Sequence, residues 1–303
     1  MTTPAVPLTV TQLENLLLGL SAEIGIPVAR ARILLGTLVV SQLLPAGTFV
    51  EGGMGMKLLL GEVGTRATSD LDLSNAERGP RWAEEFAKRL DRGWGSVPAS
   101  KGERKREPLA PHRVAFRGTL KAKKSHDPGL EKPQYVVHPY RVSLTYVGAP
   151  WLGVDVELSD PETHSEAVTT HSINRDLLLF SERLGFSEFT VAPLVELEYQ
   201  MAQKIHAVTD SNYERAHDLV DLQLLWRAHP HLAKLQEHCY QTFRWRNGHE
   251  WPPVPLRSMS GWDTAYRLAR DETVVSGSTP VLRELSKARE WLENLIHTIV
   301  AGE

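Results

Sequence analysis

The feature that most constrains the fold is a short segment in which aspartate and leucine alternate. Asp70-Leu71-Asp72-Leu73 has the period of two that is typical of a β-strand with one buried and one polar face. Both carboxylates therefore share one face of the predicted strand. Two carboxylates in this arrangement can hold a hard divalent cation such as Mg²⁺. The segment predicts a metal-binding strand in a sheet, and the alternative is an ordinary solvated strand face.

A strand, a glycine turn and a helix are predicted just before the acidic strand. Thr48-Phe49-Val50 indicates a short buried strand, Gly52-Gly53 a turn, and Met54–Leu60 a helix. Glycines at such a turn let backbone N–H groups approach phosphate oxygens, and the start of a helix favours negative charge. We expect this turn to bind the triphosphate of a nucleotide.

A third carboxylate is predicted on a later strand. Arg141–Val147 and Leu152–Leu158 alternate like strands, and Gly148-Ala149-Pro150 is expected to join them as a hairpin. Asp155 and Glu157 share one face of the second strand. Either carboxylate would complete a two-metal site with the acidic strand. The sequence pattern does not decide which of the two is the third ligand.

The order of strand and helix patterns predicts two domains in an α+β fold. The 303 residues are 42% hydrophobic and 23% charged, which is typical of a folded globular protein. After Pro161 the pattern becomes helical, with one further strand expected at Glu188–Val191. We therefore place a domain with a mixed sheet at residues 1–192 and a mainly helical domain at 193–303. The clearest helical patterns of the second domain are Val195–Val208, Glu214–Ala228 and Leu285–Val300.

The first hundred residues indicate two helices and no membrane span. Thr11 and Glu14 are placed as a capping box for the first helix, and Val28–Leu44 is predicted as the second. The most apolar stretch is too short to cross a bilayer, and the first residues lack the pattern of a secretory signal. The single cysteine, Cys239, excludes an intramolecular disulfide. We expect a cytoplasmic protein without a membrane partner.

A second constellation lies in the predicted helical domain. Lys204 is on one helix, and Asp218 and Asp221 are three residues apart on the next, so the carboxylates share a face that could meet the lysine. Lysine here could bind the phosphates of an NTP, while an aspartate acts as a base or orients the lysine. The alternative is a structural ion pair between packed helices.

Histidines near this constellation open one further alternative. His217 beside Asp218 would suit a metal-dependent phosphohydrolase, which needs additional histidine and aspartate ligands. His206, His164 and His171 do not form an evident set of that kind.

A basic stretch lies in the long polar section Gly93–Pro133. Between Lys101 and Lys124, nine basic residues stand against two acidic ones, although the net charge of the whole chain is only −3. The stretch is a candidate path for an RNA backbone, and a merely solvated surface is the alternative. Phe116, Tyr135 and Tyr140 are close enough in sequence to be considered for stacking on unpaired bases.

Four segments of the chain resemble the AbiEii-like nucleotidyltransferase toxins, in particular the MenT type. They span about 175 residues in the family's order, and the last two are the most specific. The segments are Glu51-Gly52-Gly53, Arg66–Asp72, Gln203–Val208 and Arg215–Leu225.

The resemblance implies a fold, a reaction and partners. The fold is a DNA-polymerase-β-like nucleotidyltransferase domain joined to a helical domain, with the active site in the cleft between them. The reaction is transfer of NMP from an NTP to the 3′ end of tRNA, with Mg²⁺ or Mn²⁺, which blocks aminoacylation and translation. The implied partners are the tRNA acceptor end, the NTP and the cognate antitoxin of a toxin–antitoxin system.

The resemblance also implies roles for individual residues. Asp70, Asp72 and Glu157 are the expected metal ligands, and Lys204 is the expected triphosphate contact. Asp221 is the catalytic carboxylate of the second domain. Together the catalytic residues are Asp70, Asp72, Lys204 and Asp221, and the expected nucleotide-binding residues are Gly52, Gly53, Lys57, Arg66, Thr68, Ser69 and Lys204.

One position departs from the family pattern. The family commonly has lysine directly before the paired glycines, whereas this chain has Glu51, so Lys57 or Arg66 is expected to supply the missing positive charge. Glu51 also supports a rival interpretation, a catalytically silent module that binds nucleic acid or antitoxin. A third interpretation keeps the enzyme but changes the acceptor to a protein hydroxyl or a small molecule such as an aminoglycoside.

Overall fold

The computed structural model describes eight segments of the chain, and the chain forms two compact units. The described residues are 5–77, 79–99, 111–124, 137–161, 168–210, 215–253, 260–273 and 281–302. The first unit, here called the sheet unit, comprises Met1–Leu59, Thr68–Pro161 and Thr170–Pro193. The second, the helical unit, comprises Leu60–Ala67, Glu162–Thr169 and Leu194–Glu303.

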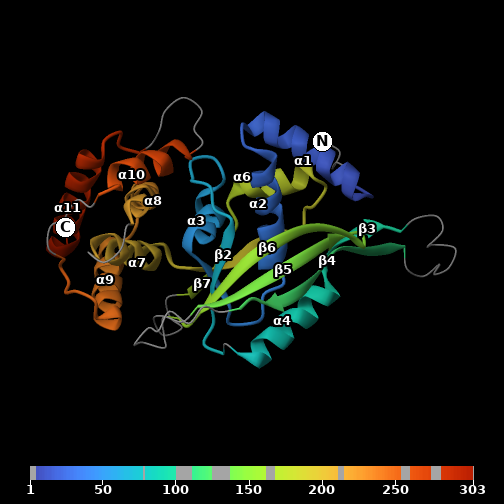
Figure 1. Ribbon diagram of the computed structural model, residues 1–303, viewed down its shortest axis with the longest axis horizontal. Coiled ribbons are helices and arrows are strands. Elements are labelled where there is room, and N and C mark those ends of the chain that lie inside the picture. The colour runs from blue at the N-terminus through green and yellow to red at the C-terminus, as the bar shows by residue number, and fades with distance from the viewer. Residues whose placement is uncertain are drawn as a thin grey trace. The chain divides into compact units, whose positions relative to one another are not determined.

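A mixed eight-stranded sheet has the strand order β3-β4-β5-β6-β2-β1-β8-β7. The long strands β4, β5 and β6 lie side by side in Figure 1. β2 pairs with β6 in parallel, whereas the pairs β1–β2, β3–β4, β4–β5 and β5–β6 are antiparallel. This mixture of sheet and helix agrees with the predicted α+β class. The strands are β1 (Phe49–Glu51), β2 (Asp70–Ser74), β3 (Trp94–Pro98), β4 (His112–Ala122), β5 (His138–Tyr146), β6 (Ala149–Ser159), β7 (Val168–Ser172) and β8 (Val191–Val195).

Helices pack on the apolar face of the sheet. A Cβ added to Gly36 in α2 would come within 2.4 Å of the Leu152 side chain, and one added to Gly118 in β4 would meet Leu90 of α4 at 3.1 Å. α2 and α4 therefore lie close against this face, and the alternating polar residues point to the other. The helices of the sheet unit are α1 (Val10–Ile24), α2 (Val28–Ser41), α3 (Gly52–Leu60), α4 (Pro80–Arg92) and α6 (Arg175–Arg183).

The predicted capping box at the start of the first helix is wrong. α1 begins at Val10, and the Thr9 hydroxyl accepts the Gln12 backbone N–H at 3.2 Å, so Thr9 is the cap. Glu14 instead accepts hydrogen bonds from Arg32 at 2.6 Å and from the Trp151 indole at 2.7 Å. These two hydrogen bonds of the Glu14 carboxylate connect α1 to α2 and to β6.

Several strands and one turn differ from the predictions. The section Gly93–Pro133 contains β3 and β4, which the sequence pattern did not reveal, and β7 was also not predicted. The hairpin between β5 and β6 turns at Val147 and Gly148, with φ of 52° and 82°, and not at Gly148-Ala149-Pro150. Positive φ at both loop residues is the type I′ geometry that matches the twist of a two-residue hairpin. β8 begins at the last residue of the strand expected at Glu188–Val191.

The helical unit is built around two buried helices. α7 packs against α8 and α9, and every α8 residue from Asp218 to Leu225 is buried, which makes this helix central. The three predicted helices are confirmed to within a few residues, while α9 and α10 were not predicted individually. The helices are α7 (Leu197–Thr209), α8 (Ala216–Trp226), α9 (Leu232–Arg246), α10 (Trp262–Asp271) and α11 (Leu285–Ala301).

Hydrophobic length gives little support for a membrane span in the described part of the chain. No single helix there is both long and apolar enough to cross a bilayer. α1 and α2 reach the necessary length and composition only as a pair, and the chain bends by 113° between them.

Gly93 gives a test of how β3 joins the sheet. Its φ is +81°, and an added Cβ would lie 2.2 Å from the Phe116 carbonyl oxygen. Gly93→Ala should therefore lower the free energy of unfolding by about 1–3 kcal/mol, measured by denaturant titration. The control is Gly19→Ala in α1, where an added Cβ meets nothing within 4 Å. That substitution should stabilise the protein by about 0.5–1 kcal/mol. Equal effects of the two substitutions would contradict the strained position of Gly93.

Candidate active site

Carboxylates from three adjacent strands share the polar face of the sheet. In the strand register, Asp72 lies between Glu51 of β1 and Glu157 of β6, and Asp70 lies opposite Asp155 of β6. The intervening leucines of β2 are buried on the other face. The structure thus brings the predicted metal ligands Asp70, Asp72 and Glu157 together, while their binding of a metal stays a prediction. We call these three side chains and Glu51 the acidic row.

Asp155 and Glu157 differ in their partners. Asp155 pairs with Lys123 at 3.0 Å and with Arg141 at 2.8 Å, and the hydrogen bond from Lys123 is the main cause of its lowered pKa. Glu157 is exposed, yet partial desolvation and the nearby Asp70 carboxylate raise its pKa. Unlike Asp155, Glu157 has no ion pair among the described contacts, so its carboxylate is not held by a basic side chain. Glu157 is therefore the better candidate for the third ligand.

The paired glycines make room for the carboxylate side chains and their neighbours. Gly52 begins α3 with φ of +64°, and an added Cβ would lie 1.9 Å from Asp72 Oδ2. A Cβ on Gly53 would lie 2.9 Å from the Thr68 hydroxyl oxygen. The Thr68 hydroxyl in turn donates to Asp70 at 3.2 Å. Both glycines therefore let the acidic strand lie against the start of α3, whose N–H groups favour negative charge.

Glu51 joins the carboxylates through a contact that the sequence analysis missed. The Ser159 hydroxyl of β6 donates to Glu51 Oε1 at 3.1 Å. Ser159 lies two residues after Glu157 and so on the same face of β6, which is the signal that could have revealed the contact. Where the family commonly has a lysine, this chain places another carboxylate beside Asp72.

A buried ion-pair network occupies the helical unit. The Lys204 ammonium donates to Asp218 at 2.9 Å and to Asp221 at 2.6 Å, and both carboxylates are inaccessible to solvent. Arg215 Nε donates to Asp218 at 2.8 Å, and Arg66 Nε donates to Asp221 at 3.0 Å. The helical hairpin therefore brings Lys204 and the two aspartates together as predicted, and adds two arginines.

Charge attraction keeps the network ionised despite its burial. Burial opposes ionisation of both Lys204 and Asp218, but their mutual attraction outweighs it, so the pKa of Lys204 is raised and that of Asp218 is lowered. Lys204, Arg66 and Arg215 face Asp218 and Asp221, and the Glu272 carboxylate also acts on Arg66. An ammonium has three N–H donors, and the two bonds to aspartate use two of them. The geometry is that of a structural ion-pair network, and the role of Lys204 as a phosphate contact stays a prediction.

Other predicted residues are placed less favourably for binding. Lys57 is only 1% exposed on α3, so burial disfavours it as a phosphate contact from solvent. Ser69 is exposed beside Asp70. Phe116 is fully buried among Trp94, Tyr146 and other rings, so its expected stacking on RNA bases is wrong. Tyr135 lies outside the described residues.

A comparison with protein-family models matches residues 32–293 to a family described as nucleotidyl transferase AbiEii toxin, Type IV TA system. The chain belongs to the AbiEii family. The matched range contains the acidic row and the ion-pair network. Membership in this family supports nucleotidyl transfer as the activity and implies an NTP substrate and a cognate antitoxin. A search of curated proteins gives no match.

The side-by-side carboxylates of the acidic row predict that a divalent cation stabilises the folded protein, because the cation would offset their mutual repulsion. Mg²⁺ should raise the melting temperature relative to EDTA, because a bound cation stabilises the folded state by mass action. In a chain of this size, each kcal/mol added to the free energy of unfolding raises the melting temperature by about 2–4 °C. Asp72→Asn should raise the melting temperature in EDTA and largely remove the Mg²⁺ effect, measured by calorimetry.

The control for this metal experiment is Asp176→Asn, an exposed aspartate in the first turn of α6. It should leave the Mg²⁺ effect unchanged. The Mg²⁺ effect should also weaken as the pH falls toward the raised pKa of Glu157, since a proton competes with the cation. A Mg²⁺ effect of equal size in Asp72→Asn would contradict the acidic row as a cation site.

Asp218→Asn tests the buried network of the helical unit. The substitution removes one of the two carboxylates that hold Lys204, so the free energy of unfolding at neutral pH should fall by about 3 kcal/mol. Because the pKa of Asp218 lies below its ordinary 3.8, its stabilisation is complete above that value and is lost as the pH falls below it. The difference between wild type and variant should therefore shrink below about pH 3.8, measured by urea unfolding. The exposed Asp263→Asn should change stability by less than about 1 kcal/mol.

Proposed function

We propose that this AbiEii-family protein transfers NMP from an NTP to the 3′ end of tRNA and thereby blocks aminoacylation and translation. The observation that carries the proposal is the convergence of Asp70, Asp72 and Glu157 on one face of the sheet. The start of α3 lies against the same carboxylates, since Gly52 adjoins Asp72. Carboxylates beside a helix N-terminus are suited to hold divalent cations together with phosphate oxygens.

The chemistry is displacement at the α-phosphorus of the NTP. The 3′ hydroxyl of the acceptor forms the new bond to phosphorus, the bond to pyrophosphate breaks, and the hydroxyl proton leaves to solvent or a base. In the proposal Asp70, Asp72 and Glu157 hold Mg²⁺ or Mn²⁺, which would neutralise the charge on the reacting phosphates.

The remaining residues of the proposal bind and orient the nucleotide. The backbone N–H groups at Gly52 and Gly53 bind phosphate oxygens, and the Thr68 hydroxyl orients Asp70, to which it already donates. Lys204 contacts the triphosphate through its remaining donor. Asp221 orients Lys204 through their hydrogen bond of 2.6 Å.

A basic surface beside the carboxylates supports RNA as the acceptor. The strand register continues from Asp155 to Arg141 of β5 and Lys121 of β4, so these residues lie on the polar face of the sheet. Lys123 reaches the same face through its pair with Asp155. Gly153 leaves room for the Arg141 side chain, because an added Cβ would lie 2.2 Å from the guanidinium. Cations arranged along a sheet face can bind successive phosphates of a polynucleotide. A small acceptor would not need such an extended basic surface.

The two rival interpretations, a silent binding module and an enzyme with another acceptor, give the acidic row different roles. A silent module that binds nucleic acid or antitoxin gains nothing from like charges held side by side, since they repel each other and any phosphate. The row is suited to a cation, and a cation is what phosphoryl-type transfer needs. An enzyme with a protein hydroxyl or aminoglycoside as acceptor shares this chemistry, so only the acceptor distinguishes it. Part of the basic stretch, Lys101 to Arg106, lies outside the described residues.

Incubation of the protein with total tRNA, Mg²⁺ and each radiolabelled NTP in turn tests the proposal. Label should appear on tRNA-sized RNA with at least one nucleotide, and periodate oxidation of the tRNA 3′ end should prevent labelling. Asp70→Asn should reduce the rate by a factor of about 10² or more, since it removes a ligand of the charge-neutralising site. The exposed Asp176→Asn should label tRNA at the wild-type rate.

Two negative outcomes are distinct. If the protein binds NTP but labels no tRNA, the acceptor is wrong, and protein and aminoglycoside acceptors are assayed next. If calorimetry detects neither NTP binding nor transfer, the silent module is correct. Label that persists at full rate in Asp70→Asn would show that the acidic row does not catalyse the transfer.

A further inference from the structure

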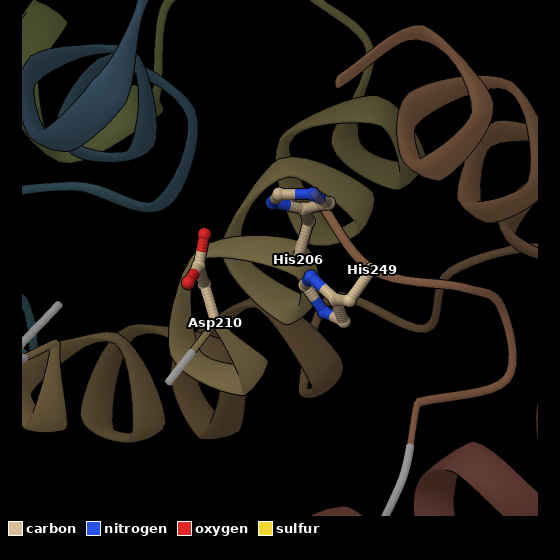
Figure 2. A group of neighbouring side chains, drawn as sticks. All are labelled: His206, Asp210 and His249. Carbon is tan, nitrogen blue, oxygen red and sulfur yellow. The ribbon is translucent and has the colours of Figure 1, made fainter. Parts of the chain in front are cut away.

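Two histidines and an aspartate converge at one end of α7 in the helical unit. His206 and Asp210 are one helical turn apart, and His249 comes from the segment after α9 (Figure 2). One potential ligand atom from each side chain lies within 4.8 Å of those of the other two. The side chains border a common space in Figure 2. Of the histidines considered with His206 from the sequence, His164 lies outside the described residues; Asp210 and His249 lie beside His206.

The hydrogen bonds of His249 leave one ring nitrogen with a lone pair. The Thr209 hydroxyl donates its single hydrogen to the Ile205 carbonyl at 2.7 Å and lies 2.8 Å from His249 Nε2. In the tautomer that fits this bond, His249 Nε2 carries the ring hydrogen and donates to the Thr209 oxygen. His249 Nδ1 is then an acceptor, and it is buried without a hydrogen-bond partner. When an imidazole binds a metal through one nitrogen, its other nitrogen usually donates a hydrogen bond that fixes the orientation of the ring, as Nε2 does here.

His206 also has a buried nitrogen without a partner. Its side chain belongs to a residue only 4% exposed, and Nε2 has no hydrogen-bond partner. Burial and the Arg246 guanidinium lower the pKa of His206 to about 3, so the ring is neutral, as a metal ligand must be. Nδ1 lies 3.4 Å from Arg246 Nη1, a long contact that would be given up when the proton moves to Nδ1.

The absence of a side chain at Gly248 keeps the space between the groups open. An added Cβ would lie 3.6 Å from both Asp210 Oδ2 and His206 Nε2, which shows that these two atoms face the same point. A cavity of about 440 Å³, lined in part by Tyr240, Phe243, Gly248 and His249, adjoins the cluster on the side of His249. The Asp210 carboxylate offsets the opposing charge of Arg246.

We propose that His206, Asp210 and His249 bind a divalent transition-metal ion of the zinc class. Two imidazoles and one carboxylate suit Zn²⁺ or a similar ion and not Mg²⁺, which prefers oxygen ligands. Three protein ligands leave a position for water or an exogenous ligand. Since metal–ligand bonds are about 2.0–2.2 Å long, the side chains must draw inward on binding. The ion ties the end of α7, the helix that carries Lys204, to the segment after α9.

Zinc titration of the full-length protein tests this site. The protein is freed of metal with EDTA, desalted and titrated with Zn²⁺ by calorimetry in excess Mg²⁺, which occupies oxygen-only sites. One equivalent should bind, and Zn²⁺ should raise the melting temperature. Asp210→Asn and His249→Gln, which keep side-chain size close to that of the wild type, should each weaken binding at least tenfold, or about 1.4 kcal/mol. Circular dichroism verifies that both variants are folded.

Two further variants show where the ion binds. His297→Gln changes an exposed histidine of α11 and should leave zinc affinity unchanged. Asp72→Asn changes the acidic row and should also leave it unchanged. Failure of the wild type to bind one equivalent would overturn the proposal. So would equal affinity in Asp210→Asn and His249→Gln, or loss of binding in Asp72→Asn alone, which would place the ion at the acidic row.

Discussion

The parallel pairing of β2 with β6 is the interaction on which the candidate site depends. Its register places Asp72 opposite Glu157, and a slip of one residue would turn the β2 carboxylates onto the apolar face. Leu71 and Leu73 are fully buried and prevent that slip, because exposing them would cost the burial of two large apolar side chains. The hydrophobic core therefore fixes the positions of the charged groups, although no carboxylate belongs to it.

The same face of the sheet changes from acidic to basic across its strands. Carboxylates lie on β1, β2 and β6, and Arg141 and Lys121 follow on β5 and β4. Asp155 lies where the two regions meet, and its pairs with Lys123 and Arg141 neutralise it. The polar face of the sheet therefore carries a group of carboxylates next to a group of cations, and Asp155 is the residue at which the two groups meet.

Local patterns predicted the acidic strand and the helical hairpin, but long-range contacts did not follow from them. The alternation in Asp70–Leu73 and the spacing of Asp218 and Asp221 each fix a face, which is a local property. Arg66 pairs with Asp221 across 155 positions, and His249 meets His206 across 43, so spacing gives no signal for either. β3 and β4 were missed because basic and glycine residues interrupt their apolar alternation. Glu51 joins the carboxylates through the pairing of β1 with β2 and through Ser159 of β6, and local spacing indicates neither contact.

The buried network at Lys204 is not the most stable way to pack two helices. Removing charges from water costs several kcal/mol per ion, and apolar side chains of similar volume often pack at least as stably. α7 and α8 already bury Ile205, Leu219 and Leu222 completely, so their packing does not need an ion pair. The network instead fixes which residues of the two helices meet. Lys204 is held by one carboxylate from each of two successive positions on α8, three residues apart, so a shift of α8 by one residue would break both bonds and leave a buried charge without a partner.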